Sequence, residues 1–203
     1  MHIGVVLVTV NKSIYIRTLH ALMRINLFAI SNNHIVELTF VDKDPFLIKD
    51  ALNNGIKKYD KLLLLDYGIF IDQESIETLN KDVQNHGMII YPCVKEGVDW
   101  ELFKNNMNDE PITQAGLQFD TSVGKKIIDG FYKVEKSEPK VWCLDCKKVS
   151  KKFSFPVKRS ELIPKLKEDG VKICVFSKAK IITSYVHECY GSIVQAAGVS
   201  SSK

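Results

Sequence analysis

The chain has 203 residues, of which 45% are hydrophobic and 26% are charged, enough to bury the core of one compact domain. The formal net charge of +4 is mild, so nothing in the charge indicates a nucleic-acid partner. No run of about 18 apolar residues is present, which excludes a membrane span.

The cysteine content and the first residues indicate the compartment. Five cysteines are an odd number in a chain too large to need disulfides, so we predict reduced thiols. Residues 1–4 show neither a basic region nor a small-residue cleavage site. We therefore predict a soluble, cytoplasmic protein. Its lysines are scattered except for a basic cluster over 147–159, which suits a phosphate or an acidic surface and is also typical of a solvated face.

The chain begins with a strand pattern followed by a helix pattern. Residues 3–10 are almost wholly apolar and β-branched, which is typical of a strand covered on both faces. Ser13 is placed to cap a helix whose apolar residues recur at three- and four-residue intervals, as one stripe. The predicted stripe consists of Ile16, Leu19, Leu22, Met23 and Ile25.

The same order then repeats. Residues 34–41 predict a second strand, and Asp44 and Pro45 predict the cap and first turn of a helix that stops at Gly55. A third apolar run, 62–65, ends abruptly at Asp66. Strand, helix, strand order implies right-handed crossovers and a Rossmann-like α/β fold, with a mostly parallel central sheet flanked by helices.

The later sequence has a weaker rhythm. Residues 72–83 predict a helix and residues 87–92 a strand. Short helices are predicted near 99–105 and 123–130. The last predicted elements are strands at 132–134, 141–144 and 171–176, with a helix over 160–168.

Asp66 is the leading candidate for function. Ligands of open α/β sheets bind where the carboxyl ends of the strands stop, so a carboxylate delivered there by a buried strand is a candidate site residue. We expect the Asp66 carboxylate to point into a solvent-open hollow beside the loop that follows the first strand. A turn that terminates the strand is the structural alternative.

The layout of about the first 100 residues resembles the nucleotide-sugar-dependent glycosyltransferases of GT-A fold. The small size is similar to that of soluble members from bacteria, phages and large DNA viruses. The resemblance implies that the loop after the first strand and an acidic residue after the second strand hold the nucleotide. The family's Asp-x-Asp motif falls on Asp66-Tyr67-Gly68, which matches it only at the first position. The implied nucleotide-binding residues are Thr9, Val10, Asn11, Asp42, Asp44, Asp66, Tyr67 and Gly68.

The same resemblance implies a divalent cation, Mn²⁺ or Mg²⁺, that bridges the phosphates of the donor. The last aspartate of the motif commonly ligates this ion, and Gly68 has no side chain to do so. The family's late histidine falls on His187, so Asp66 and His187 are the implied ligands, with Asp72 a further candidate. Neutralisation of the diphosphate by a nearby Lys or Arg is the alternative, and a lone histidine is also commonly structural.

A second acidic segment, 96–101, follows the strand at 87–92. Asp99 is the candidate base for the acceptor hydroxyl, and Trp100 offers a flat apolar face to a sugar ring. A helix cap at Asp99 and a core position for Trp100 are the structural alternatives.

Two other functions remain open. Cys143 and Cys146 form a Cys-x-x-Cys pair, which is typical of half a zinc site. If His187 and Cys189 supply the second pair, the chain is a zinc-supported interaction domain. Gly68 stands where the family has the second aspartate of its motif, so the other alternative is a non-catalytic binding module that retained the fold and lost this residue. Classical dinucleotide binding and P-loop hydrolysis are disfavoured because their glycine motifs are missing from the sequence.

These patterns predict one domain over 1–203, with a nucleotide-binding half at 1–92 and an acceptor-binding, closing half at 93–203. The predicted reaction transfers a hexose from a UDP-type donor to a hydroxyl of a glycan or a protein. The predicted partners are this donor and acceptor, and the small size also suits a domain of a larger enzyme.

Overall fold

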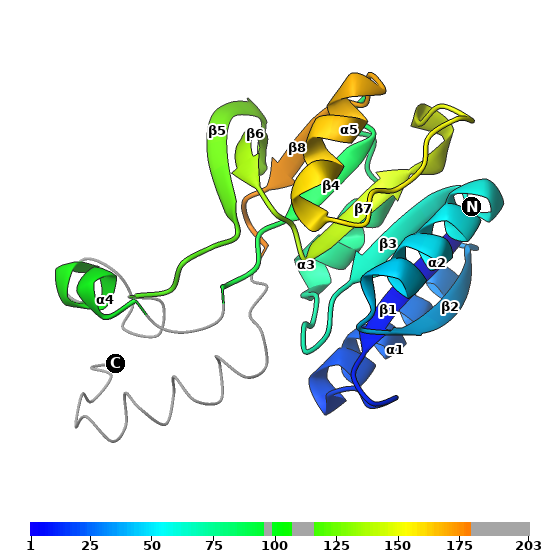
Figure 1. Ribbon diagram of the computed structural model, residues 1–203, viewed down its shortest axis with the longest axis horizontal. Helices are drawn as coiled ribbons and strands as arrows, with labels where there is room; N and C mark the ends of the chain where they lie inside the picture. The colour runs from blue at the N-terminus through cyan, green and yellow to red at the C-terminus, as the bar shows by residue number, and fades with distance from the viewer. Residues whose placement is uncertain (96–98, 107–115, 180–203) are drawn as a thin grey trace.

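The computed structural model describes residues 1–95, 99–106 and 116–179. Within these ranges the chain forms an eight-stranded sheet with helices on both faces (Figure 1). The strands are β1 (His2–Thr9), β2 (Ile35–Asp42), β3 (Lys61–Leu65), β4 (Met88–Tyr91), β5 (Thr121–Ile128), β6 (Phe131–Ser137), β7 (Val141–Asp145) and β8 (Ile173–Phe176). The helices are α1 (Ile16–Ser31), α2 (Pro45–Lys58), α3 (Gln73–Glu77), α4 (Trp100–Asn106) and α5 (Leu162–Glu168), with short 3₁₀ turns at Thr78–Asn80, Cys146–Lys148 and Arg159–Glu161.

The sheet is mixed, so the prediction of a mostly parallel sheet is confirmed only in part. The strand order is β2-β1-β3-β7-β4-β8-β6-β5. β1 lies parallel to β2 and β3, and β4 lies parallel to β8. β7 runs antiparallel between β3 and β4, and the β5–β6 hairpin adds further antiparallel pairs. The Rossmann-like part is therefore the half built from β1, β2 and β3.

The helix predicted at 123–130 is wrong, because these residues belong to the hairpin of β5 and β6. Its turn is Asp129-Gly130, and Gly130 has a φ of 76°, in the left-handed region that glycine adopts without steric cost. An Asp-Gly pair between two strands is a strong hairpin signal. The apolar spacing of residues 123–130 indicated a helix, and this hid the hairpin signal.

Three predicted boundaries also shift. Ser13 does not cap α1, since its hydroxyl donates to the carbonyl of Val10 at 2.7 Å and Tyr15 occupies the N-cap position. Gly55 does not stop α2, which continues to Lys58. A Cβ at Gly55 would lie 2.7 Å from Cδ1 of Leu62, so this glycine permits close packing of helix on strand. The helix expected over 72–83 is the shorter α3 followed by a 3₁₀ turn.

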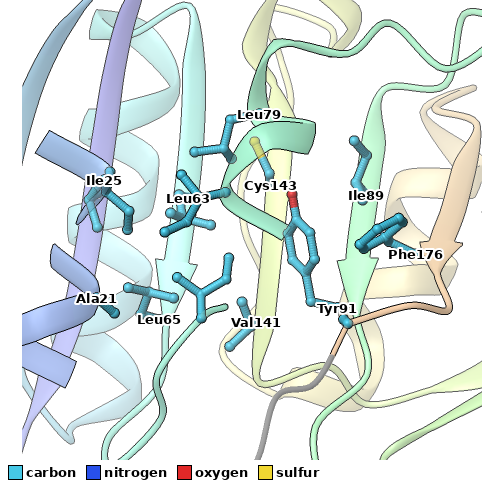
Figure 2. Close-up of a cluster of buried hydrophobic side chains, with 14 of the residues drawn as sticks. Ala21, Ile25, Leu63, Leu65, Leu79, Ile89, Tyr91, Val141, Cys143 and Phe176 are labelled. Carbon is cyan, nitrogen blue, oxygen red and sulfur yellow. The ribbon is translucent and has the colours of Figure 1, made fainter. Parts of the chain in front are cut away.

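Both faces of the sheet are covered by apolar side chains. On one face, Ala21 and Ile25 of α1 lie near Leu63 and Leu65 of β3, as Figure 2 shows. Tyr91 in the same cluster is fully buried, and its hydroxyl lies 2.8 Å from Oγ1 of Thr78. The alternate residues of β3 point to the other face, where α2 and α5 pack. Burial on both faces explains the unbroken apolar run of β3.

The predicted single stripe of α1 is wrong. Leu22 and Ile25 are buried against the sheet, whereas Ile16, Leu19 and Met23 are exposed. No helix in the described ranges is both long and apolar enough to cross a bilayer.

Candidate functional site at the carboxyl edge of the sheet

The ends of β1 and β2 meet in a hydrogen-bonded turn. Thr9 Oγ1 donates to Oδ1 of Asp42 at 2.8 Å, and the Lys12 amide donates to the same oxygen at 3.2 Å. These bonds, chiefly the one from Thr9, hold the pKa of Asp42 below its usual value. Asn11 and Lys12 have φ values of 51° and 58°, and Val10 closes this tight turn by pairing with Ser13. The structure thus brings Thr9, Val10, Asn11 and Asp42 together.

Asp44 is occupied as a helix cap. Its Oδ1 accepts the backbone N–H groups of Phe46 at 2.8 Å and Leu47 at 2.9 Å, and Pro45 follows at the first helical position. This confirms the predicted start of α2. A nucleotide contact from Asp44 stays a prediction.

Asp66 is buried and ion-paired. It is 5% exposed, and its Oδ2 accepts a hydrogen bond from Nη1 of Arg159 at 2.7 Å. Its Oδ1 accepts the backbone N–H of Tyr67 at 2.8 Å. The expectation that the Asp66 carboxylate is open to solvent is therefore wrong: it is the buried counter-ion of Arg159. The side chain of Arg159 is 33% exposed, so Arg159 presents positive charge at this edge. Because Leu65 of β3 pairs with Leu7 of β1, Asp66 follows β3 next to the end of the strand that carries Thr9.

Backbone geometry gives a physical reason for glycine at the third position of the acidic motif. Gly68 has a φ of 73°, where a side chain is strained, and a Cβ there would lie 3.2 Å from Cε2 of Tyr15. The ring of Tyr67 lies 5.3 Å from the ring of Tyr15 and lines the same turn. An aspartate at position 68 would therefore require the turn to change.

The described residues at this edge form no cluster of side-chain ligands for a divalent cation. No three His, Cys, Asp or Glu side chains within the described ranges lie close enough together to hold one. The carboxylate of Asp72 accepts the Ser75 amide at 2.8 Å as the cap of α3, and both oxygens of Asp66 are engaged. His187, the other predicted ligand, lies outside the described residues. Beside Asp66 the positive charge comes from Arg159.

A cavity of about 530 Å³ opens beside the same edge, between α2 and the segment that leads into α5. Its volume is typical of a small-molecule site. Trp142 and Phe155 stack in its wall at 5.7 Å between ring centroids, and the buried Trp142 Nε1 has no hydrogen-bond partner in the part of the chain described. Four cations and one carboxylate also line it, namely Lys43, Lys49, Lys158, Arg159 and Glu138. The cavity therefore suits a ligand with an apolar part and negative charge.

Asp120 anchors the segments around Asp66 and was missed by sequence reasoning. Its Oδ1 accepts from the Cys93 amide at 3.0 Å and from Oγ1 of Thr121 at 2.8 Å, and its Oδ2 accepts from the Lys140 amide at 3.2 Å. Burial raises the pKa of Asp120. The carbonyl of Lys140 in turn accepts the Asp66 amide at 3.2 Å, so Asp120 supports the position of Asp66. No local pattern marks Asp120, whereas Arg159 belongs to the basic cluster recognised in the sequence.

Asp99 precedes α4 and Trp100 is its first residue, and both lie apart from the Thr9 turn. Asp99 accepts the amides of Glu101 and Leu102, each at 3.0 Å, and the Leu102 bond is the main cause of a lowered Asp99 pKa. The helix-cap interpretation of Asp99 is therefore confirmed. Trp100 is 51% exposed, so the core interpretation of Trp100 is wrong. Figure 1 shows α4 beyond the β5 end of the sheet, opposite β1 and β2. The acceptor roles of both residues stay predictions.

The Cys-x-x-Cys pair is not assembled as a metal site by the described residues. Cys143 lies in the core of one face of the sheet, and Cys146 packs against the core of the other face. Burial raises the pKa of Cys143 to about 11 and that of Cys146 to about 12, so both thiols stay protonated at neutral pH. His187 and Cys189 lie outside the described residues.

Comparison with known proteins identifies the fold. No protein-family model and no curated protein matches the sequence. The crystal structure of S. aureus TarS 1-349 matches 98% of this chain and 65% of the TarS chain, with a TM-score of 0.51 and 14% identity. The present chain thus spans less than two thirds of that protein. A putative glucose-1-phosphate thymidylyltransferase from Bacillus anthracis, crystallised with sucrose, matches all of this chain and 98% of its own, with a TM-score of 0.50 and 12% identity. At these identities the likeness shows the fold alone, which is GT-A-like.

Proposed function

We propose that this chain is a transferase that moves a hexose from a UDP-type nucleotide sugar to a hydroxyl of a glycan or a protein. One observation carries the proposal: buried Asp66 holds Arg159 at the carboxyl end of β3, close to the hydrogen-bonded turn of Thr9 and Asp42. The fold supports it, because TarS is a glycosyltransferase and shares this GT-A-like fold.

The donor is proposed to lie along this edge. Its nucleoside contacts the turn of Thr9, Asn11 and Asp42, and its diphosphate lies against Arg159. Lys43 and Lys158 line the cavity beside Arg159 and add positive charge. When the bond between the anomeric carbon and the diphosphate oxygen breaks, negative charge develops on the leaving group, and preorganised cations stabilise it. Asp66 is a positioning residue in this scheme, because it acts through Arg159.

For the acceptor, we propose that Asp99 receives the proton of the attacking hydroxyl and that Trp100 contacts the acceptor sugar. This proposal requires α4 to approach the Thr9 edge from its place beyond β5. The acceptor oxygen forms the new bond to the anomeric carbon as the diphosphate leaves.

Arg159 and the lysines, rather than Mn²⁺ or Mg²⁺, are proposed to neutralise the diphosphate. The engaged oxygens of Asp66 and the left-handed turn at Gly68 support this choice.

Calorimetry with UDP and several UDP-hexoses, first in EDTA and then with Mn²⁺, tests both proposals. We expect binding in EDTA with an affinity that changes by less than about threefold, or ~0.7 kcal/mol, when Mn²⁺ is added. Failure of every compound to bind at millimolar concentration would contradict the proposed function. Binding that appears only with Mn²⁺ would contradict the metal-free scheme alone.

Nucleotidyl transfer is the second candidate, favoured by the match over nearly the whole length of the thymidylyltransferase. Incubation with a nucleoside triphosphate and a hexose 1-phosphate distinguishes the two, because nucleotidyl transfer releases pyrophosphate. Release of UDP from a UDP-hexose identifies glycosyl donor chemistry. Nucleotide binding without either product identifies a non-catalytic module.

A further inference from the structure

Helix α1 carries a second apolar stripe that covers nothing in the described chain. Its core stripe is Thr18, Ala21, Leu22, Ile25 and Ala29. Five other large apolar side chains are exposed at three- and four-residue intervals, which places them on one face of the helix. They are Ile16, Leu19, Met23, Leu27 and Ile30, and Ile16, Leu27 and Ile30 are 73%, 62% and 63% exposed. Contiguous exposed apolar surface of this kind marks an interaction site.

The polar flank of α1 shows which way this stripe faces. Arg24 lines a recess together with Gln73 and Glu77 of α3, and Arg17 lies over the ring of Phe70 at 5.7 Å. The basic flank is therefore turned toward α3. The opposite flank, with Leu19 and Ile30, is turned toward β2, which Figure 1 shows at the end of the sheet beside α1.

Strand β2 continues this apolar surface onto the sheet edge. Val36 packs against the core on the α1 side, and Leu38 and Phe40, which share its face of the strand, are exposed. Edge strands are commonly protected by Lys or Pro, and β2 contains neither. The two carboxylates of β2 are both engaged within the chain: Glu37 forms an ion pair with Lys58, and Asp42 accepts a hydrogen bond from Thr9.

The backbone of β2 also has an open edge among the described strands. The amide of Ile35 donates to Met1 O at 3.0 Å, and the amide of Lys43 donates to Thr9 O at 2.8 Å. In a parallel pair every second residue bonds its neighbour, so the odd-numbered residues of β2 face β1. Val36, Leu38 and Phe40 consequently direct their N–H and C=O groups outward.

We propose that two copies of this chain form a two-fold symmetric dimer in which their β2 strands pair antiparallel and their exposed α1 stripes pack together. With Leu38 opposite its own counterpart, Val36 faces Phe40 of the second copy, and every outward-facing residue joins a hydrogen-bonded pair. Glu37 then faces Thr39. A register shifted by two residues would keep the outward-facing groups paired but would place Glu37 against Glu37, and like charges directly opposite are destabilising.

A second copy fits this surface better than a lipid surface does. The unpaired backbone groups of β2 require a strand as partner, because hydrocarbon offers neither donors nor acceptors. A two-fold axis also makes the surface self-complementary, since the same strand and the same helix face meet across it.

Sedimentation velocity of the full chain between about 1 and 100 μM tests this dimer. We expect the wild type to dimerise, and we expect Leu38→Lys and Met23→Glu each to weaken dimerisation by at least about tenfold with an unchanged circular dichroism spectrum. Phe46→Lys is the matched control, because Phe46 is an exposed apolar residue of α2 outside this surface and its replacement should leave the dimer intact. A wild type that stays monomeric overturns the proposal, and so does a dimer that survives both variants. A monomer that binds phosphatidylglycerol vesicles also overturns it and identifies lipid as the partner.

Crosslinking tests the register. Hydrogen-bonded antiparallel pairs have Cα atoms about 5.5 Å apart, within the range of a disulfide. Mild oxidation should crosslink Leu38→Cys into covalent dimers, while Glu37→Cys and the wild type with its native cysteines should stay uncrosslinked. Crosslinking of Glu37→Cys alone would overturn the proposed register.

Discussion

Replacement of Asp66 by alanine is expected to lower the free energy of unfolding by about 3 kcal/mol, because it leaves the Arg159 guanidinium without its counter-ion. This value lies at the low end for breaking a buried pair, since a third of the Arg159 side chain remains in solvent. Urea denaturation followed by circular dichroism measures the effect.

Asp44→Ala is the matched control for Asp66→Ala. Asp44 is exposed and caps α2, so its loss should cost only about 1 kcal/mol. An Asp66→Ala variant as stable as the wild type would contradict the ion pair. If Asp66 were open to solvent, as the sequence alone predicted, its replacement by alanine would cost little stability. Because Asp66 is buried, we expect a large loss instead.

Asp120→Ala should be the second most destabilising change, at about 2 to 3 kcal/mol, because the amides of Cys93 and Lys140 lose their common acceptor. Thermal and urea unfolding measure the loss. Because burial raises the pKa of Asp120, its folded-state pKa lies above its unfolded-state value, so its stabilising contribution is greatest at low pH. The advantage of the wild type over Asp120→Ala should therefore shrink as pH rises through the folded-state pKa.

Asp129→Ala provides the comparison for Asp120→Ala. Asp129 is a largely exposed acid in the hairpin turn, paired with Lys126 and Lys178 at the surface, and exposed pairs contribute little. We expect the free energy of unfolding of Asp129→Ala to stay close to that of the wild type. If Asp120→Ala proves no more harmful than Asp129→Ala, Asp120 does not anchor the segment next to Asp66.

The elements that the sequence predicted best have local causes. The apolar run of β3 follows from burial on both faces, and the start of α2 follows from Asp44 and Pro45. Helical periodicity placed α1 correctly, but spacing alone does not tell which of two apolar stripes meets the core. The strand at 141–144 was predicted and is β7, but its antiparallel place between β3 and β4 was not, and this strand makes the sheet mixed.

The candidate site was harder to predict because it depends on contacts between distant residues. Arg159 lies 93 residues from Asp66 in sequence, and Asp120 contacts Cys93 and Lys140, which are 27 and 20 residues away. No local pattern encodes such pairs. The positions of Thr9 and Asp42 were predictable because parallel neighbouring strands end at the same edge of a sheet.

The most direct test of the account is a calorimetric titration of UDP in EDTA into three proteins: the wild type, Arg159→Gln and Arg24→Gln. Each variant removes one guanidinium charge, at the sheet edge in Arg159→Gln and on the outer surface of α1 in Arg24→Gln. We predict that Arg159→Gln weakens UDP binding by about 10- to 100-fold, or ~1.4 to 2.8 kcal/mol, while Arg24→Gln binds as the wild type does. Equal UDP affinity of the wild type and a folded Arg159→Gln protein would contradict the proposal that Arg159 binds the diphosphate.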